Sequence, residues 1–139
     1  MGRLLDTNVL LYSLSTASDE RWKRDVAREI LESSENVVSV QVLQEFYVQS
    51  TRATRKDPIS HDLAVGLIRT WLRFPVQTVT IEVLGLALDL RAKHGWSYWD
   101  SAVVASALTA GCNTVLTEDL QHGQVVAGLT IVNPFRVEP

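Results

Sequence analysis

Short β-branched segments alternate with amphipathic helical segments along most of this chain, and this alternation limits the fold more than any other feature. Strand-like segments lie at residues 3–6, 37–40, 76–80, 114–117 and 129–132. Helical apolar spacing lies between them, at about residues 18–33, 41–51, 60–74, 82–94 and 98–110. Ser18 and Ser60 can cap two of these helices, and Gly95 can end another in the left-handed conformation. The predicted inner faces of the helices at 60–74 and 82–94 include four leucines: Leu63, Leu72, Leu84 and Leu88. Such an alternation of strands and helices predicts a parallel sheet covered on both faces. The predicted fold class is therefore α/β, a three-layer sandwich around a central, mainly parallel sheet.

The length and composition fit one globular domain. The chain has 139 residues, 46% apolar and 21% charged, which excludes a disordered or collagen-like protein. Its one cysteine, Cys112, excludes an internal disulfide and a four-cysteine zinc site. The acidic residue Asp6 comes before any apolar run that could form a secretion signal, and no apolar run is long enough for a membrane span. We expect a single domain over residues 1–139, located in the cytoplasm and without a membrane partner.

Four acidic residues fall where the predicted strands end. Asp6 ends the first strand, Asp119 follows the fourth, Glu45 lies in the first turns of the helix after the second, and Asp100 opens the most apolar helix. The carboxyl ends of parallel strands share one edge of a sheet, where α/β proteins collect their ligands. Carboxylates that meet there need cations to stay ionised, and oxygen-only clusters prefer Mg²⁺ or Mn²⁺. The pattern predicts metal-assisted hydrolysis of a phosphodiester.

Each acid taken alone has an ordinary structural interpretation as a helix cap, a loop acid or a solvated helix residue, so the hypothesis depends on the set. Nearby short polar residues support it, because Thr7, Asn8 and Thr117 can orient a carboxylate or a water molecule. Glu118 stands beside Asp119, and the sequence leaves open which of the two reaches a metal.

Several motifs occur in an order that resembles a known family. They are Leu5–Tyr12, Gln44–Phe46, Tyr98–Ala102 and Leu116–Gly123, followed by the ending Ile131–Phe135. Together they resemble the PIN-domain ribonucleases, and among these most closely the VapC toxins of bacterial toxin–antitoxin pairs. The resemblance covers nearly the whole chain and implies a single PIN-like nuclease domain.

The resemblance also implies an activity and partners. It identifies Asp6, Glu45, Asp100 and Asp119 as the catalytic quartet, with Asp6, Asp100 and Asp119 holding one or two Mg²⁺ or Mn²⁺ ions. It implies an endonuclease that cleaves RNA through a metal-activated water, with Glu45 positioning or deprotonating that water and a 5′-phosphate and a 3′-hydroxyl as products. A homodimer and a small VapB-like antitoxin that blocks the site are further implications.

Charge neither supports nor excludes an RNA substrate. Thirteen basic and sixteen acidic side chains give a formal net charge of −3, and the chain without the four site acids would carry +1. A basic segment follows Glu45, and its candidate RNA contacts are Arg52, Arg55 and Lys56. A solvated helix end is an equally good interpretation of that segment.

An aromatic cluster precedes Asp100 in the sequence. Trp96, Tyr98 and Trp99 have side chains that can stack on a base, although core packing or a subunit contact is the favoured interpretation.

Two alternatives stay open. A phosphatase of the haloacid-dehalogenase type also starts with an aspartate after the first strand, but it needs a second aspartate where this chain has Asn8. A non-catalytic PIN scaffold that binds RNA or protein is the other. The complete acidic quartet speaks against that scaffold, because clustered carboxylates without a cation lower stability.

Overall fold

The computed structural model describes residues 2–137, which contain a six-stranded sheet. The strands follow the order β3-β2-β1-β4-β6-β5, and all neighbouring pairs are parallel except β5 with β6. The predicted α/β class with a mainly parallel sheet is confirmed, whereas the antiparallel strand β5 has no counterpart among the predicted strands. The strands are β1 (Arg3–Leu5), β2 (Asn36–Ser39), β3 (Val76–Gln77), β4 (Thr114–Leu116), β5 (Val125–Val126) and β6 (Leu129–Val132).

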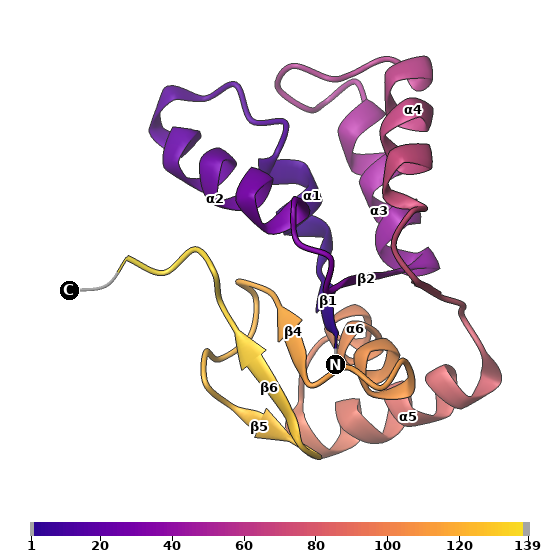
Figure 1. Ribbon diagram of the computed structural model, residues 1–139. Helices are drawn as coiled ribbons and strands as arrows, with labels where there is room; N and C mark the ends of the chain where they lie inside the picture. The colour runs from indigo at the N-terminus through magenta and orange to yellow at the C-terminus, as the bar shows by residue number, and fades with distance from the viewer. Residues whose placement is uncertain (1, 138–139) are drawn as a thin grey trace.

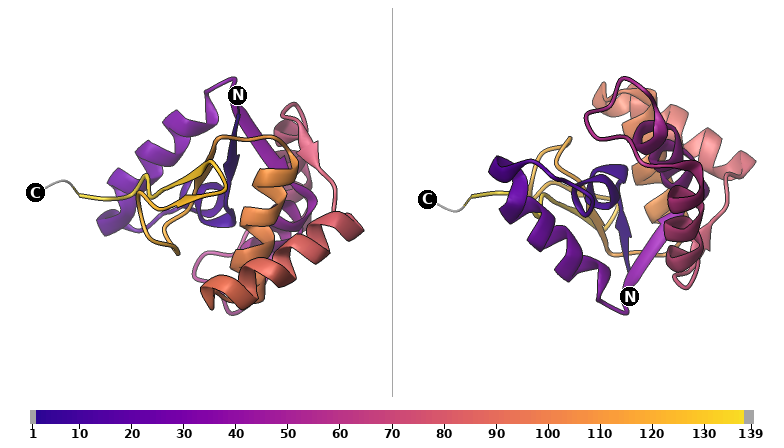
Figure 2. Two further views of the ribbon diagram at one scale, coloured as in Figure 1. Left: turned by 90° about the horizontal axis from the view of Figure 1, so that it is seen from below. Right: turned by 90° about the horizontal axis from the view of Figure 1, so that it is seen from above.

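The helices form a layer on each side of this sheet (Figures 1 and 2). The chain adds strands in one direction from β1 to β3 and then returns to place β4 on the other side of β1. Because parallel crossovers are right-handed, this reversal puts α5 and α6 on the face opposite α1–α4. The helical elements are α1 (Thr7–Tyr12), the 3₁₀ turn η1 (Ser18–Glu20), α2 (Arg21–Leu31), α3 (Val40–Thr51), α4 (His61–Trp71), α5 (Ile81–His94) and α6 (Tyr98–Thr109).

Local capping residues fix where the helices start and stop. Four helices begin after a serine or threonine whose hydroxyl accepts the backbone N–H three residues later, which satisfies a donor that the helix leaves free. These caps are Ser39, Ser60, Thr80 and Ser97. Gly95 ends α5 in the left-handed conformation with φ 72°, as its position in the sequence predicts.

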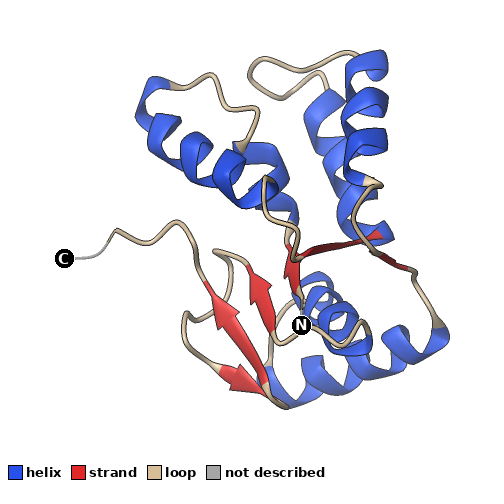
Figure 3. Cartoon of the chain, in the orientation of Figure 1, coloured by secondary structure: helices blue, strands red, loops and turns tan. Residues whose placement is uncertain are grey.

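The core centres on α6, which the sequence predicts to be the most buried helix. Its residues 101–107 are all buried and lie against β1, β3 and β4. α5 packs against α6 from outside (Figure 3), and the residues of α5 that are buried are Val83, Ala87 and Leu90. No helix within residues 2–137 is long and apolar enough to cross a membrane.

The structure corrects the sequence interpretation at four places. Ser18, a predicted helix cap, lies inside the 3₁₀ turn η1, and α2 begins three residues later. The helix α1 directly after Asp6 is absent from the predicted elements, because its six residues are too few for a periodic signal. Of the three aromatic residues favoured for the core or a subunit contact, Trp96 and Tyr98 pack against the core, whereas Trp99 is 63% exposed and is not a core residue. Several apolar residues of the predicted inner faces of α4 and α5 are also exposed, because these outer helices bury only a narrow stripe: Leu63, Leu72, Leu84 and Leu88.

Candidate metal centre

Asp6 is the buried centre of the site. It follows β1 directly, its side chain is only 5% exposed, and its backbone N–H donates to the Leu116 carbonyl at 3.0 Å. Its Oδ1 accepts the Thr7 N–H at 2.7 Å, and its Oδ2 accepts the Thr117 hydroxyl at 2.6 Å. β1 and β4 are paired in parallel, so their ends bring Asp6 and Thr117 together. Both carboxylate oxygens are therefore held in one orientation.

Two further aspartates meet Asp6 at this edge of the sheet. Asp6, Asp100 and Asp119 each offer a carboxylate oxygen, and these three oxygens lie within 4.8 Å of one another. Asp100 comes from the first turn of α6, where its N–H is capped by Ser97 at 3.1 Å. Asp119 comes from the loop after β4. The N-terminal strand thus converges on one point with two segments from the last third of the chain.

The three carboxylates are crowded, although only Asp6 is buried, whereas Asp100 is partly exposed and Asp119 is exposed. The pKa of each carboxyl group is raised. Burial raises the pKa of Asp6 to about 7, although the Thr117 and Thr7 hydrogen bonds oppose the change. Burial also raises the pKa of Asp100, opposed by Ser97 and reinforced by the charge of Glu45. For Asp119, burial and then the charge of Asp100 raise the pKa. Like charges that share a site resist simultaneous ionisation, so the cluster favours a bound cation.

Glu45 lies beside this trio on α3 and is joined to it by hydrogen bonds. Its Oε2 accepts the Thr7 hydroxyl at 3.1 Å, and its Oε1 accepts the amide of Gln41 at 2.8 Å. That amide also donates to the Trp99 carbonyl at 3.2 Å, which links α3 to the start of α6. Sequence analysis missed Gln41; its position one turn before Glu45 on the same helix face was the available signal.

The predicted supporting residues all contact the carboxylates. The Asn8 amide donates to Asp119 Oδ2 at 3.0 Å. Thr117 accepts the Asp119 N–H at 3.1 Å while it donates to Asp6, so one hydroxyl orients two of the three aspartates. Together with Thr7, these residues form the hydrogen-bonded surroundings that fix carboxylate ligands around a metal.

Glu118 points to a different set of partners from Asp119. Its Oε1 accepts the Tyr12 hydroxyl at 2.6 Å, and its Oε2 lies 3.5 Å from Lys23 Nζ. Lys23 Nζ also donates to Tyr12 at 3.1 Å. The question that the sequence leaves open is thus answered geometrically: Asp119 joins the cluster, and Glu118 bonds to Tyr12 and Lys23. Neither of these partners was identified from the sequence.

One residue of the basic segment, Arg55, lines a groove that reaches the site. Arg55 and Asn8 line the same groove, and Asn8 is the residue that bonds Asp119. Arg52 and Lys56 lie in the loop between α3 and α4, where Arg52 is exposed and Lys56 is exposed as well. Of the three predicted RNA contacts, Arg55 is the one that the groove places beside the site.

The three aspartates fit a divalent cation. All offered ligands are oxygens, which Mg²⁺ and Mn²⁺ prefer. Two oxygens bound to one Mg²⁺ ion at about 2.1 Å lie at most roughly 4 Å apart. The distances of up to 4.8 Å between the three carboxylate oxygens are comparable. A bound divalent ion would also stabilise the ionised carboxylates that burial disfavours.

The fold and site define a class of protein: a parallel α/β sandwich with a cluster of carboxylates at the carboxyl edge of its sheet. Within this class, the chain belongs to the PIN domain family, whose model matches residues 3–127. The resemblance found in the sequence motifs is confirmed. No curated protein matches the sequence.

Solved structures with the same fold include toxin–antitoxin proteins. A toxin–antitoxin complex from Klebsiella pneumoniae matches with a TM-score of 0.70 and 19% identity over 98% of this chain and 100% of that chain. VapC20 from Mycobacterium tuberculosis, a sarcin–ricin loop cleaving toxin, matches at 0.64 and 17% over 82% and 87%. DNA-bound VapBC from Salmonella typhimurium matches at 0.65 and 18% over 94% and 96%. These identities are low, and the matches establish the shared fold.

Proposed function

We propose that this protein is a Mg²⁺- or Mn²⁺-dependent endoribonuclease, the toxin component of a VapBC-type toxin–antitoxin pair. Membership of the PIN domain family supports a nuclease. The observation that carries the proposal is the convergence of three carboxylate oxygens within 4.8 Å at the carboxyl edge of the sheet. Residues 1–139 would act as one nuclease domain, in the cytoplasm.

In this proposal Asp6, Asp100 and Asp119 hold one or two divalent ions. A bound ion would lower the pKa of a water ligand and neutralise charge on the phosphoryl group. Thr117 keeps Asp6 in its orientation, and Asn8 does the same for Asp119. Such fixed orientation matters because metal sites lose affinity when the partners of their ligands are removed.

Glu45 completes the cluster in this mechanism. Its carboxylate accepts hydrogen bonds from Thr7 and Gln41, which hold it beside the three aspartates. From there Glu45 orients the attacking water or accepts its proton. The water attacks an RNA phosphodiester in line, and the products are a 5′-phosphate and a 3′-hydroxyl.

A VapB-like antitoxin and a second copy of the chain are the proposed protein partners. Structures of the same fold described as a toxin–antitoxin complex and as VapBC support the antitoxin. The apolar side chains exposed along one face of α5 support a contact with a second copy, because exposed apolar patches mark interaction surfaces: Ile81, Leu84 and Leu88.

The two alternatives receive less support. A haloacid-dehalogenase-type phosphatase needs an acid at the position of Asn8, and Asn8 instead donates a hydrogen bond to Asp119. A non-catalytic scaffold would have no use for carboxylates whose pKa values are raised by burial and crowding.

Cleavage of total RNA by protein purified free of any partner tests the proposal. The reactions contain Mn²⁺, Mg²⁺ or EDTA, and a parallel set uses Asp100→Asn. We expect discrete fragments with the metal ions, and none with EDTA or with the variant. Fragment ends carrying 5′-phosphates would agree with the proposed chemistry.

Other outcomes would contradict it. Cleavage that persists in EDTA and in Asp100→Asn would come from a contaminant or a different site. Absence of cleavage, together with Mn²⁺-dependent hydrolysis of p-nitrophenyl phosphate, would favour the phosphatase. A folded protein that neither cleaves RNA nor gains thermal stability from Mn²⁺ would favour the scaffold.

A further inference from the structure

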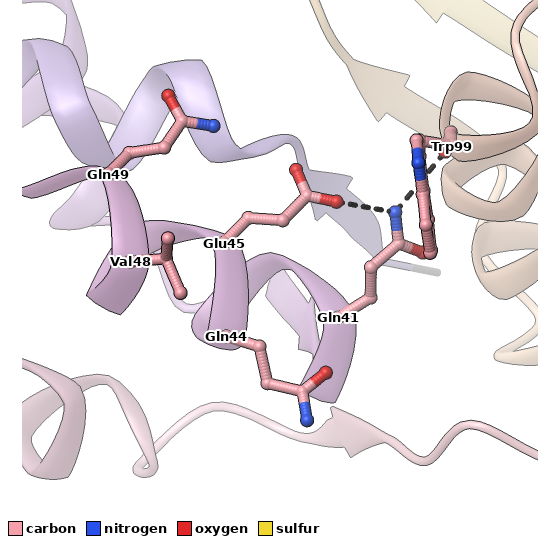
Figure 4. Close-up of a pocket in the computed structure, with 6 residues that line it drawn as sticks. All are labelled: Gln41, Gln44, Glu45, Val48, Gln49 and Trp99. Carbon is pink, nitrogen blue, oxygen red and sulfur yellow. Dashed lines mark hydrogen bonds between the residues drawn. The ribbon is translucent and has the colours of Figure 1, made fainter.

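A pocket beside the acidic cluster has a lining unlike that of the cluster itself. It has a volume of about 390 Å³ and runs from Glu45 along the exposed side of α3 to the first turn of α6. Figure 4 shows its α3 residues in a row, with Trp99 of α6 facing them near Gln41. The lining residues are Gln41, Gln44, Glu45, Val48, Gln49 and Trp99.

The lining combines a flat aromatic surface with free amides. Trp99 is 63% exposed and Val48 is 60% exposed, so both offer apolar surface to solvent. The side-chain amides of Gln44 and Gln49 form no hydrogen bond within residues 2–137, unlike the amide of Gln41. Each glutamine amide offers two donors and an acceptor. An indole that can stack and amides that can read a polar edge together match a planar heteroaromatic ring.

The charge of the pocket favours a base over a phosphate as its ligand. Glu45 is the only ionisable residue in the lining, and its carboxylate lies beside three further acids. A phosphate in this pocket would meet negative charge and no basic side chain of the lining. A neutral base would not be repelled, because its stacking on an aromatic ring needs no counter-charge.

The backbone that carries the indole is anchored beside the acidic cluster. Trp99 immediately precedes Asp100, and its carbonyl accepts the Gln41 amide that also holds Glu45. A T-shaped contact with Tyr98, with ring centroids 5.1 Å apart, orients the ring without covering both of its faces. A base stacked on Trp99 would therefore lie a fixed number of nucleotides from the phosphodiester that is cleaved.

We propose that this pocket is a nucleobase subsite, in which an unpaired base of the RNA stacks on Trp99 and is read by the amides of Gln44 and Gln49. The inference rests on the proposed ribonuclease function and adds to it a determinant of substrate choice. It requires a single-stranded or flipped-out nucleotide next to the cleaved bond, since a paired base presents no free face to the indole.

The test measures RNA affinity without requiring cleavage. Fluorescence anisotropy in EDTA reports binding of a short, fluorescein-labelled single-stranded RNA, and of the same RNA with one abasic nucleotide moved along its length. The variants are Trp99→Leu, which keeps apolar bulk but removes the ring, and Trp99→Phe, which keeps a ring. Leu72→Ala is the matched control, because Leu72 is 51% exposed at the end of α4 and outside the pocket.

We expect Trp99→Leu to weaken binding about tenfold and Trp99→Phe to weaken it less. One abasic position should weaken binding to the wild type by a similar factor and add nothing in Trp99→Leu. In Mn²⁺, Trp99→Leu should also shift the preferred cleavage positions while cleavage continues. Leu72→Ala should match the wild type in every measurement.

Three outcomes would overturn the inference. If Trp99→Leu binds RNA as tightly as the wild type and cuts the same positions, Trp99 reads no base, although the proposed nuclease function survives. If sedimentation shows that Trp99→Leu separates a dimer into monomers while RNA affinity is unchanged, Trp99 belongs to a contact between two copies. If the wild type neither binds nor cleaves RNA, the proposed function fails, and the subsite fails with it.

Discussion

The two ends of the parallel sheet both bury polar side chains, but they treat them in opposite ways. At the amino end, β1 and β2 start with the paired residues Arg3 and Asn36, and Asn36 is 1% exposed. Its Oδ1 accepts Arg3 Nε at 3.0 Å, and its amide donates to the carbonyls of Ile30 at 2.8 Å and Ser33 at 3.2 Å. The oxygen of the Asn36 amide therefore has a hydrogen-bond donor, and its nitrogen has hydrogen-bond acceptors.

At the carboxyl end, the buried Asp6 and the more exposed Asp100 and Asp119 are acceptors that crowd one another. Asp6, Asp100 and Asp119 bring carboxylate oxygens within 4.8 Å, and no basic side chain pairs with them among residues 2–137. The threonines and Asn8 orient these carboxylates without neutralising their charge. The amino end is a finished structural contact. The carboxyl end is incomplete without a cation, which is the property expected of a functional site.

Neutralising one carboxylate should have the largest effect, and it tests whether the carboxyl end is a functional site. We expect Asp100→Asn to lower RNA cleavage by more than about 100-fold, since even residues that only orient a metal ligand change activity by about 10- to 100-fold. In EDTA the same substitution should leave the melting temperature unchanged or raise it, because it removes a negative charge from the crowded cluster. Cleavage assays and calorimetry on the same preparations measure both effects. A variant that loses activity only because it unfolds would contradict this assignment.

The opposite pattern is expected at the amino end of the sheet. Asn36→Ala removes the acceptor of Arg3 Nε, the side-chain donor to the Ser33 carbonyl and one of the donors to the Ile30 carbonyl, so we expect unfolding free energy to fall by about 3 kcal/mol and the melting temperature by about 10 °C. Cleavage per folded molecule should stay near the wild-type value. Urea denaturation and activity at low temperature check this. Glu35→Ala, at the exposed neighbouring position, is the control and should change stability by less than about 0.5 kcal/mol.

The pH dependence of stability sharpens the comparison. The pKa of Asp6 is about 7 in the folded protein, against 3.8 as the ordinary value. Between these two values the folded state keeps a proton that the unfolded state releases, so stability falls as pH rises through this range and levels off above about pH 7. We expect the metal-free protein to lose roughly 2 kcal/mol between about pH 5 and pH 7.

Urea denaturation in EDTA measures this loss, and Asp6→Asn should abolish most of it. Mn²⁺ binds the ionised carboxylates, so its stabilising effect should be larger at pH 8 than at pH 6. A pH dependence that is the same in Asp6→Asn would mean that other groups cause it.

The smallest expected effect concerns the groove that leads away from the carboxyl end. Reversing Arg55 and Lys56 to Glu should reduce the salt dependence of RNA binding, by about 0.7 in the logarithmic slope for each RNA phosphate that these side chains no longer neutralise. The same double reversal at Arg69 of α4 and Lys93 of α5 changes net charge equally and serves as the control. Equal slopes for the two double variants would show that only net charge matters.

The sequence predicted the elements whose signals are local. The cap Ser60, the stop at Gly95 and the nearly all-apolar run of α6 depend on residues a few positions apart, and the structure confirms them. The helix α1 escaped prediction because six residues make less than two helical turns. β5 escaped because two residues carry no alternation, and only its pairing with β6 makes it a strand.

The sequence by itself also determined which acids stand at strand ends, and the alternation of strands and helices already implied that these ends share an edge. The tertiary structure decided what lies within bonding distance. It brought Asp6, Asp100 and Asp119 together, turned Glu118 toward Tyr12 and Lys23, and left Trp99 exposed. Neighbouring residues such as Glu118 and Asp119 share a local sequence signal. Their surroundings differ because each side chain meets elements distant in the chain, and those contacts form only when the sheet and its two helical layers assemble.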